Sequence, residues 1–161
     1  LETNSLAHRT TWLRSDFSLL IPLCVGGAAA LAIMNSMDQY ARLTKPPLSP
    51  PSWLFPVVWS VLYLLMGISC YRVVVSGAKS RKTALTVYGI QLAVNFLWPI
   101  FFFRTEDFLF SFIWLILLWI LIAVMLSQFK TIDKTAALLQ IPYLLWVTFA
   151  GYLNLGIALL N

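Results

Sequence analysis

Long apolar stretches separated by short polar clusters make up most of this chain. Five intervals contain no Asp, Glu, Lys or Arg, and they run between positions 16 and 38, 45 and 72, 82 and 104, 107 and 130, and 134 and 161. A helix needs roughly 20 apolar residues to cross the hydrocarbon of a bilayer, so each interval is long enough to cross once. The runs are continuously apolar rather than alternating, which favours helices over the strands of a membrane barrel.

The pattern therefore predicts an all-α integral membrane protein, a single bundle of five transmembrane helices over residues 1–161. The expected elements are a polar lead-in at 1–15, helices near 17–37, 53–72, 83–103, 108–129 and 135–160, and a proline-rich loop at 40–52. Composition agrees, because 60% of the residues are hydrophobic and 11% are charged, whereas a soluble domain is about one quarter charged. The charged residues are too few to cover a globular surface.

The basic residues alternate between the two sides of the predicted bundle. One side carries Arg9, Arg14, Arg72, Lys79, Arg81, Lys82, Lys130 and Lys134, and the other carries Arg42, Lys45 and Arg104. The positive-inside rule then predicts a cytoplasmic N-terminus and, after an odd number of spans, a C-terminus on the opposite side. The net charge of +5 does not indicate a nucleic-acid partner, because the basic residues are not grouped with aromatic residues on a soluble face.

Four prolines within six residues mark the segment between the first two predicted helices. Proline fixes its own φ and moves the preceding residue out of the α region, so this loop should be extended and stiff. One interpretation is a rigid connector that starts the second helix, and the other is a lid over a binding site, since binding residues collect on loops. The candidate lid residues are Tyr40, Lys45, Pro46, Pro50 and Pro51.

Three of the predicted helices carry stripes of aromatic and amide residues at helical spacing. These stripes are Trp59, Tyr63 and Met66; Gln91, Asn95 and Trp98; and Pro142, Trp146, Ala150 and Asn154. Taken singly, each stripe is typical of interhelical packing with a polar tie. Taken together, they favour an enclosed aromatic cavity for a large, flat, apolar ligand, with Trp59, Trp98 and Trp146 as ring surfaces and Asn95 and Asn154 as polar handles.

The usual parts of catalytic and metal sites are absent from the predicted spans. The single histidine, His8, falls in the lead-in, and no Asp or Glu lies within a span. Acid–base and metal-assisted chemistry in the membrane therefore lack their ordinary groups, and so does proton-coupled transport. We expect no catalytic residue, no metal site and no required cofactor.

Four blocks of this sequence, in order and spacing, resemble the TspO/MBR family. They are Leu43-Thr44-Lys45-Pro46 with Pro50-Pro51, the run WSVLYLLMG at 59–67, the run QLAVNFLWP at 91–99, and the run PYLLWVTFA at 142–150 followed by Asn154. The family comprises the tryptophan-rich sensory proteins of bacteria and the mitochondrial translocator proteins, also called peripheral benzodiazepine receptors. The resemblance extends from about residue 40 to the end of the chain.

The resemblance implies a five-helix bundle with a pocket near one membrane face, under the loop between helices one and two. It implies porphyrins such as haem or protoporphyrin IX, cholesterol-like steroids and benzodiazepine-like compounds as ligands, and a bacterial cell membrane as the location. The family's pocket residues fall on Trp59, Asn95, Trp98, Trp146 and Ala150. Tetrapyrrole sensing, regulation or transfer is the implied role. Light- and oxygen-dependent degradation of porphyrin by Trp59 and Trp146 and passive porphyrin or sterol transport are the alternatives.

The resemblance also points to a homodimer. Gly89 and Ala93 form a small-residue pair that fits close packing against a second subunit, or equally against a neighbouring helix of the same chain. The chain departs from the family at Gln39 and Leu48, where family loops often carry Trp. The lid is therefore less aromatic than the family pattern implies.

Overall fold

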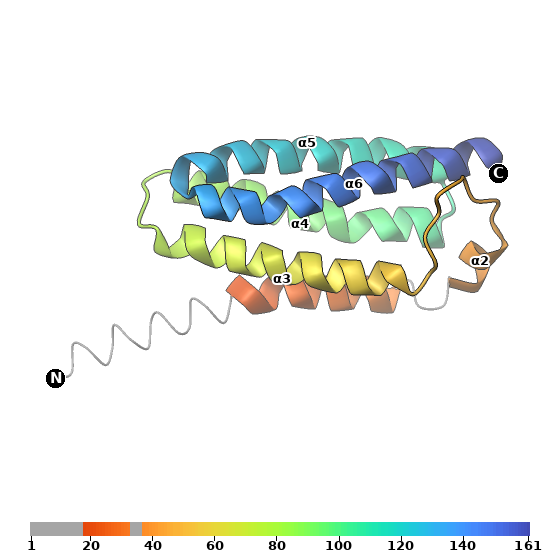
Figure 1. Ribbon diagram of the computed structural model, residues 1–161, viewed down its shortest axis with the longest axis horizontal. Helices are drawn as coiled ribbons and strands as arrows, with labels where there is room; N and C mark the ends of the chain where they lie inside the picture. Colours follow the sequence, from red (N-terminus) through yellow and green to blue (C-terminus); the bar gives the residue numbers. More distant parts are fainter. Residues whose placement is uncertain (1–17, 33–36) are drawn as a thin grey trace.

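The computed structural model describes residues 18–32 and 37–161, and the predicted polar lead-in at 1–15 lies outside them. An N-terminal helix covers Ser18–Ala32. The elements that follow are α2 (Met37–Arg42), α3 (Leu54–Val75), α4 (Arg81–Pro99), the π-helix η2 (Ile100–Arg104), α5 (Phe108–Ile132) and α6 (Lys134–Leu160). Figure 1 shows the long helices lying side by side, each antiparallel to the next along the chain.

Four helical stretches in the described residues are long and apolar enough to cross a membrane. They are Leu54–Val75, Arg81–Arg104, Phe108–Ile132 and Lys134–Leu160, close to the ranges that the charge-free intervals predict. The fifth predicted span, 17–37, is not confirmed, because the described helix Ser18–Ala32 is shorter than a full crossing and residues 33–36 lie outside the described part. The all-helical architecture is confirmed, whereas the bundle of five spans is not.

A regular buried stripe joins α5 to the rest of the bundle. Its members repeat at alternating steps of four and three residues, the spacing of one helical face, and are Ser111, Leu115, Leu118, Ile122, Met125 and Phe129. This face packs mainly on α6 and α4. The opposite face exposes Leu109, Ile113 and Ile116, as suits a helix whose outer side meets lipid.

The N-terminal helix lies against α3 through two glycines. A Cβ on Gly67 would lie 3.0 Å from the Cα of Leu19, and one on Gly26 would lie within van der Waals radii of the Tyr63 ring. Small residues at such crossings let membrane helices approach closely. This contact makes the N-terminal helix a wall of the space between α3 and α4.

Proline accounts for the change of helix type at the end of α4. Pro99 has no backbone N–H, so the α-helical hydrogen bond that it would donate is lost, and the next turn widens into η2. The N–H of Thr105 donates to the carbonyl of Ile100, five residues earlier. Such π-turns are frequent at functional sites, and this one places Phe103 beside the cavity described below.

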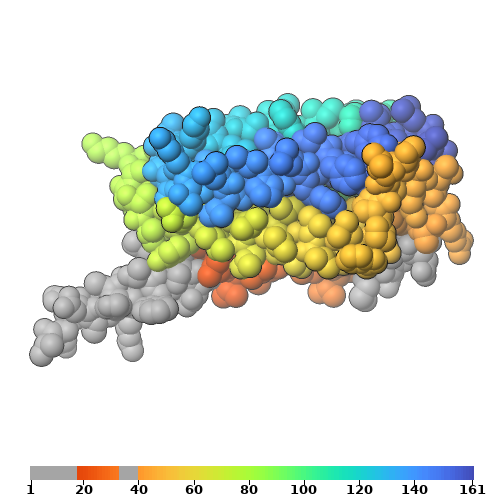
Figure 2. All heavy atoms as spheres, in the orientation of Figure 1, coloured from red at the N-terminus to blue at the C-terminus, as the bar shows by residue number. Residues whose placement is uncertain are grey.

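The predicted loop at 40–52 is shorter than expected, because α2 continues to Arg42. The prolines start at Pro46, so the backbone restriction that they impose does not reach residues 37–42. The irregular segment is therefore 43–53, hereafter the lid loop. Figure 2 shows this orange segment lying against the dark-blue final turns of α6.

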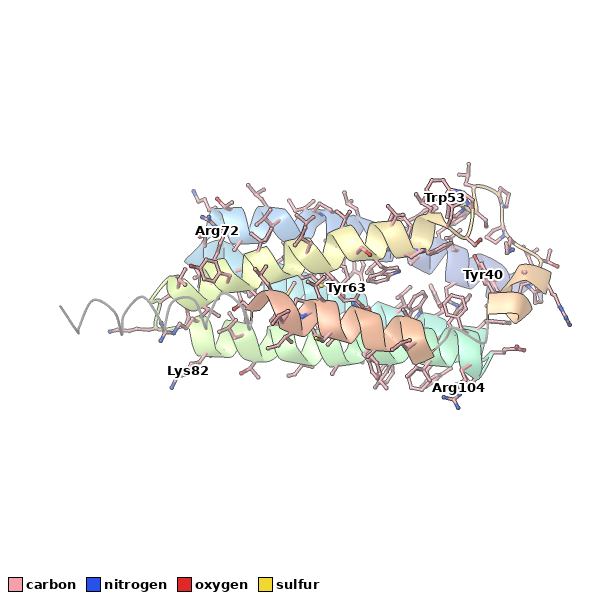
Figure 3. All side chains as sticks on the ribbon, turned by 90° about the horizontal axis from the view of Figure 1, so that it is seen from below. Tyr40, Trp53, Tyr63, Arg72, Lys82 and Arg104 are labelled. Atoms are coloured by element: carbon pink, nitrogen blue, oxygen red, sulfur yellow. The ribbon has the colours of Figure 1, made fainter. Side chains whose placement is uncertain are left out.

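The two ends of the bundle differ in charge. The lid loop, α2 and η2 lie at one end, the loop end. The opposite end, the basic end, carries Arg72, Lys79, Arg81, Lys82, Lys130 and Lys134. Figure 3 shows Tyr40, Trp53 and Arg104 at the loop end and Arg72 and Lys82 at the basic end.

Candidate ligand-binding cavity

A cavity of about 410 Å³ opens inside the loop end of the bundle. Its walls come from the N-terminal helix, α2, the lid loop, the first turns of α3, the end of α4 and η2. The residues that form them are Gly26, Ala29, Ala30, Tyr40, Ser52, Trp53, Phe55, Pro56, Trp59, Tyr63, Asn95, Trp98, Pro99 and Phe103. None of these side chains carries a charge at neutral pH, so the cavity suits an uncharged and largely apolar body.

Two tryptophans from facing helices form the main ring surface of this cavity. Trp59 of α3 and Trp98 of α4 have ring centroids 6.5 Å apart and planes inclined at 36°. Tyr63, one turn below Trp59, extends the surface with a centroid distance of 5.6 Å. Rings that stand within stacking range of one another and border an open space form a surface onto which a flat ligand can stack.

Polar groups lie at the floor of the cavity and connect to a buried network. Asn95, only 1% exposed, donates from Nδ2 to the Tyr143 hydroxyl at 3.0 Å, and that hydroxyl donates to Oε1 of Gln91 at 2.8 Å. A side-chain hydrogen bond also joins Tyr63 to Asn95. Because buried amides need partners, the network fixes the orientation of the one amide that borders the cavity.

Asn154 does not border the cavity and is instead hydrogen-bonded to the indole of Trp98. Its Oδ1 accepts from Nε1 of Trp98 at 3.1 Å and from Oγ of Ser111 at 3.2 Å, while its Nδ2 donates to the carbonyl of Phe108 at 2.8 Å. One amide thus joins α4, α5 and α6. The structure thus places Asn154 beside Trp98 rather than at the cavity, and its role as a polar handle for a ligand stays a prediction.

The remaining predicted residues of α6 lie apart from the cavity. Trp146 borders a separate apolar groove of about 470 Å³ on the outside of the bundle, between α3 and α6, hereafter the outer groove. Phe55 lines the cavity, and its ring centroid lies 5.9 Å from that of Trp146. Ala150 is buried in the bundle core. Of the predicted set, the structure brings Trp59, Tyr63, Asn95, Trp98 and the lid residue Tyr40 together around one space.

The lid loop contacts α6 and its C-cap residue Asn161 at three places. Pro46 packs so closely on Gly156 that a Cβ there would lie 2.6 Å from the proline ring. The Tyr152 hydroxyl donates to the carbonyl of Pro47 at 2.7 Å. The Asn161 side chain pairs with the backbone of Thr44, accepting its N–H at 2.9 Å and donating to its carbonyl at 3.0 Å.

Tyr40 closes one side of the cavity below the lid loop. Its ring contacts those of Phe55, Phe102 and Phe103, and burial raises the pKa of its hydroxyl, which therefore stays protonated at neutral pH. The ammonium of Lys45 sits 4.7 Å from the centroid of this ring, within the range of a cation–π contact. Of the other lid candidates, Pro50 is half-buried and Pro51 is exposed, and neither borders the cavity.

Sequence reasoning missed three aromatic cavity residues, Trp53, Phe55 and Phe103. Trp53 ends the lid loop and Phe55 lies in the first turn of α3, so their position directly after the prolines was a usable signal. Phe103 borders the cavity because of the wide π-helical turn after Pro99. Neither helical spacing nor hydrophobicity predicts that turn. Leu48, where the family pattern often has Trp, is 83% exposed and does not border the cavity.

The small-residue pair of α4 faces outward. Gly89 and Ala93 are both exposed, and a Cβ on Gly89 would meet nothing within 4 Å. The pair therefore does not mediate a close helix contact within the described chain. The homodimer stays a prediction.

Comparison with known proteins gives one consistent result. Residues 18–160 match the sequence model of the TspO/MBR family. The chain is 38% identical to Protein CrtK of Rhodobacter capsulatus over 90% of this chain and 92% of that protein. It is 36% identical to the tryptophan-rich protein TspO of Chlorobaculum tepidum, over 89% and 96%, and 36% identical to the translocator protein of Bos taurus, over 71% and 70%.

Proposed function

Because this chain is an integral membrane protein that belongs to the TspO/MBR family, we propose that it is a membrane receptor for porphyrins, haem or protoporphyrin IX, and for steroid- or benzodiazepine-like apolar ligands. The observation that carries the proposal is the loop-end cavity, in which Trp59 and Trp98 form an uncharged ring surface. Its volume of about 410 Å³ falls in the range of small-molecule sites. The role served is tetrapyrrole sensing, regulation or transfer.

The proposal is tested by titrating the purified protein with protoporphyrin IX and following the shift of the porphyrin absorbance band. We expect saturable binding that Trp59→Ala weakens about fivefold, since loss of an aromatic stacking surface costs on the order of 1 kcal/mol. Trp119→Ala is the matched control, because Trp119 lies on the outer face of α5 and donates to Thr148. Absence of saturation, or equal losses in the two variants, would overturn the proposal.

Porphyrin degradation in light is the second candidate function, and the position of Trp59 favours it. The Trp59 indole borders the cavity directly, so a bound porphyrin would lie against it, whereas Trp146 does not line the cavity. We expect Trp59→Phe to slow light-dependent loss of porphyrin absorbance and Trp146→Phe to leave it unchanged. Equal bleaching rates in the wild type and in both variants would count against an enzymatic role.

We also propose that the basic end faces the cytoplasm of a bacterial cell and that the loop end faces the opposite side. The support is the excess of Lys and Arg at the basic end. In a Cys24→Ser background, Lys79→Cys and Leu48→Cys place single exposed thiols at the two ends. An impermeant maleimide should label the cysteine at 48, and not the one at 79, in intact cells; the reverse pattern would invert the topology.

A further inference from the structure

One face of α6 leads from a cation at the basic end to the outer groove. Its residues repeat at steps of four, four and three positions, the spacing of a single helix face, and are Lys134, Leu138, Pro142 and Leu145. All four are exposed, and the last two line the outer groove. This face therefore begins with an ammonium group and continues as exposed apolar surface down to the groove.

A matching face of α3 lies beside it. Val61, Ile68 and Arg72 also share one helix face, and Val61 lines the outer groove. Arg72 lies 2.8 Å from Asp133, the residue that precedes Lys134, so α3 and α6 meet at the basic end as well as at the groove. The two faces together form one surface, hereafter the α3–α6 face, with its cations at one end.

The basic end has an excess of positive charge. Within the described part of the chain, six basic residues lie there with one acidic residue, Asp133, which is already paired with Arg72. No described carboxylate forms an ion pair with Lys134. The loop end is balanced by sequence, because it carries three basic and three acidic residues, namely Arg42, Lys45 and Arg104 with Asp38, Glu106 and Asp107. Residues 1–17 contain two of each and add no net charge.

The outer groove lies at the depth that a lipid acyl chain reaches from the basic end. Lys134 and Trp146 are about 18 Å apart along α6 at 1.5 Å per residue, and one leaflet supplies roughly 15 Å of hydrocarbon. The groove is lined by Val, Leu, Pro, Trp and Phe side chains and offers almost only apolar surface. The nearby hydroxyls of Ser60 and Thr148 donate to backbone carbonyls of their own helices, so they leave the groove suited to a hydrocarbon chain.

We propose that the α3–α6 face binds one acidic phospholipid from the leaflet at the basic end. The phosphate pairs with Lys134, while Arg72 neutralises Asp133 beside it, and one acyl chain follows Leu138 into the outer groove. An acidic headgroup is selected over a zwitterionic one because only the acidic headgroup brings a net negative charge to the unpaired cation. The site is separate from the loop-end cavity and does not depend on the ligand of that cavity.

The test uses tryptophan fluorescence of the whole chain in phosphatidylcholine vesicles. Phosphatidylglycerol with brominated acyl chains is included at increasing mole fractions, because bromine quenches a tryptophan that it contacts. We expect a saturable component of quenching, about fivefold tighter for this lipid than for brominated phosphatidylcholine, as one cation near a charged headgroup implies. Trp146→Phe should remove the saturable component, and Trp119→Phe, which removes an exposed indole of α5, should keep it.

Three further measurements make the result specific to the headgroup end. Lys134→Gln should weaken saturable quenching about fivefold, and Lys134→Arg should preserve it. Lys82→Gln is the matched control, since it removes an exposed cation of the same end from α4, away from the α3–α6 face. Millimolar glycerol phosphate, which has the phosphate without the chains, should not displace the lipid.

Four outcomes would each overturn the inference. Equal affinity for the two lipids would remove the headgroup preference, and equal weakening by Lys134→Gln and Lys82→Gln would indicate a diffuse surface potential instead of a site. Saturable quenching that survives Trp146→Phe would place the acyl chain outside the outer groove. Displacement by glycerol phosphate would mean that the cation binds free phosphate and not a lipid.

Discussion

The loop half and the basic half of the bundle are built from the same helices and yet differ in how they fill their interior. In the basic half, Val73, Met125, Phe129 and Ala136 are completely buried and leave no exposed side-chain surface. In the loop half, the N-terminal helix, α2, the lid loop, α3, α4 and η2 surround the loop-end cavity of about 410 Å³. The bundle thus combines a close-packed half with a half whose interior is left open.

The difference follows from residue type. The basic half is filled by apolar side chains that include the flexible Met125, which can adapt to irregular gaps. In the loop half, large rings such as Trp59 and Trp98 border the open space, and Trp98 is oriented by the hydrogen bond that it donates to Asn154. We infer that the basic half carries most of the stability and that the loop half carries the binding.

The substitution with the largest expected effect on this division removes a large side chain from the basic half. Phe129→Ala should lower the free energy of unfolding by about 2–3 kcal/mol, less than the 3–5 typical of soluble cores, because in a membrane only the packing loss applies. Phe129 is fully buried and its ring stacks on Tyr88 at 6.1 Å. Thermal unfolding in detergent measures the loss, and porphyrin affinity in the folded protein should be unchanged. A large drop in affinity would contradict the division.

The next test concerns the link between packing and binding at Asn154. Asn154→Leu removes three hydrogen bonds and leaves Nε1 of Trp98 without a partner, whereas the carbonyl of Phe108 still accepts from Ser111. Interhelical bonds in membranes average about 0.6 kcal/mol each, so a loss of about 1–2 kcal/mol is expected. Affinity should also fall, because Trp98 loses its fixed orientation.

The ligand affinity of a double variant distinguishes this positioning role from direct contact with the ligand. If Asn154 acts through Trp98, adding Asn154→Leu to Trp98→Leu should cost no further affinity, whereas a direct ligand contact would give additive losses. Additive losses would restore the sequence-based interpretation of Asn154 as a polar handle.

These cases show which parts of the structure the sequence predicts. The spans follow from charge-free intervals, since a charge within the hydrocarbon is costly, and their limits agree within a few residues for α3 to α6. Helical spacing also brings Trp59 and Tyr63 to one side of α3, and Asn95 and Trp98 to one side of α4. Local periodicity is sufficient for such pairs.

Periodicity does not say which neighbour a stripe faces, and this limited the prediction for α6. Trp146 and Asn154 lie on one side of that helix, but the structure directs Trp146 to the outer groove and Asn154 to the junction with α4 and α5. The contacts of Asn161 with Thr44 and of Tyr152 with Pro47 join positions more than a hundred residues apart. No local pattern encodes such pairs.

A third test asks whether the contact of the lid loop with α6 slows the release of a ligand from the loop-end cavity. Gly156→Ala places a methyl group 2.6 Å from the ring of Pro46, so the loop must shift away from α6. We expect ligand dissociation to become several-fold faster, measured by stopped-flow displacement, with a stability loss of about 1 kcal/mol or less. Gly89→Ala is the matched control, because its methyl group meets nothing within 4 Å.

In that control, the intrinsic helix preference of alanine should raise stability by about 0.5–1 kcal/mol and leave ligand release unchanged. If Gly156→Ala behaved like the control, the close contact with Pro46 would have no role in retaining a ligand.

The smallest effect is expected at the basic end, where one carboxylate caps α6 and pairs with α3. The Asp133 side chain accepts the N–H of Ala136 at 2.9 Å and lies 2.8 Å from Arg72, and these contacts, with the backbone bond first, lower the pKa of Asp133 below its ordinary value. Because the carboxylate is ionised at a lower pH in the folded protein than in the unfolded one, its stabilisation is complete above pH of about 5 and is lost as pH falls through the lowered pKa.

Melting temperatures between pH 3 and pH 6 test this expectation with a matched pair of variants. Asp133→Ala should cost about 1 kcal/mol at neutral pH and flatten the acid branch of the stability curve. Asp107→Ala removes the corresponding cap of α5 at the loop end, where the carboxylate accepts the N–H of Phe110 without an ion pair. If the stability of the basic half depends on the contacts at its own end, Asp133→Ala should lower the free energy of unfolding more than Asp107→Ala does. Equal costs would mean that the Arg72 contact adds nothing beyond the cap, and that packing alone distinguishes the two halves.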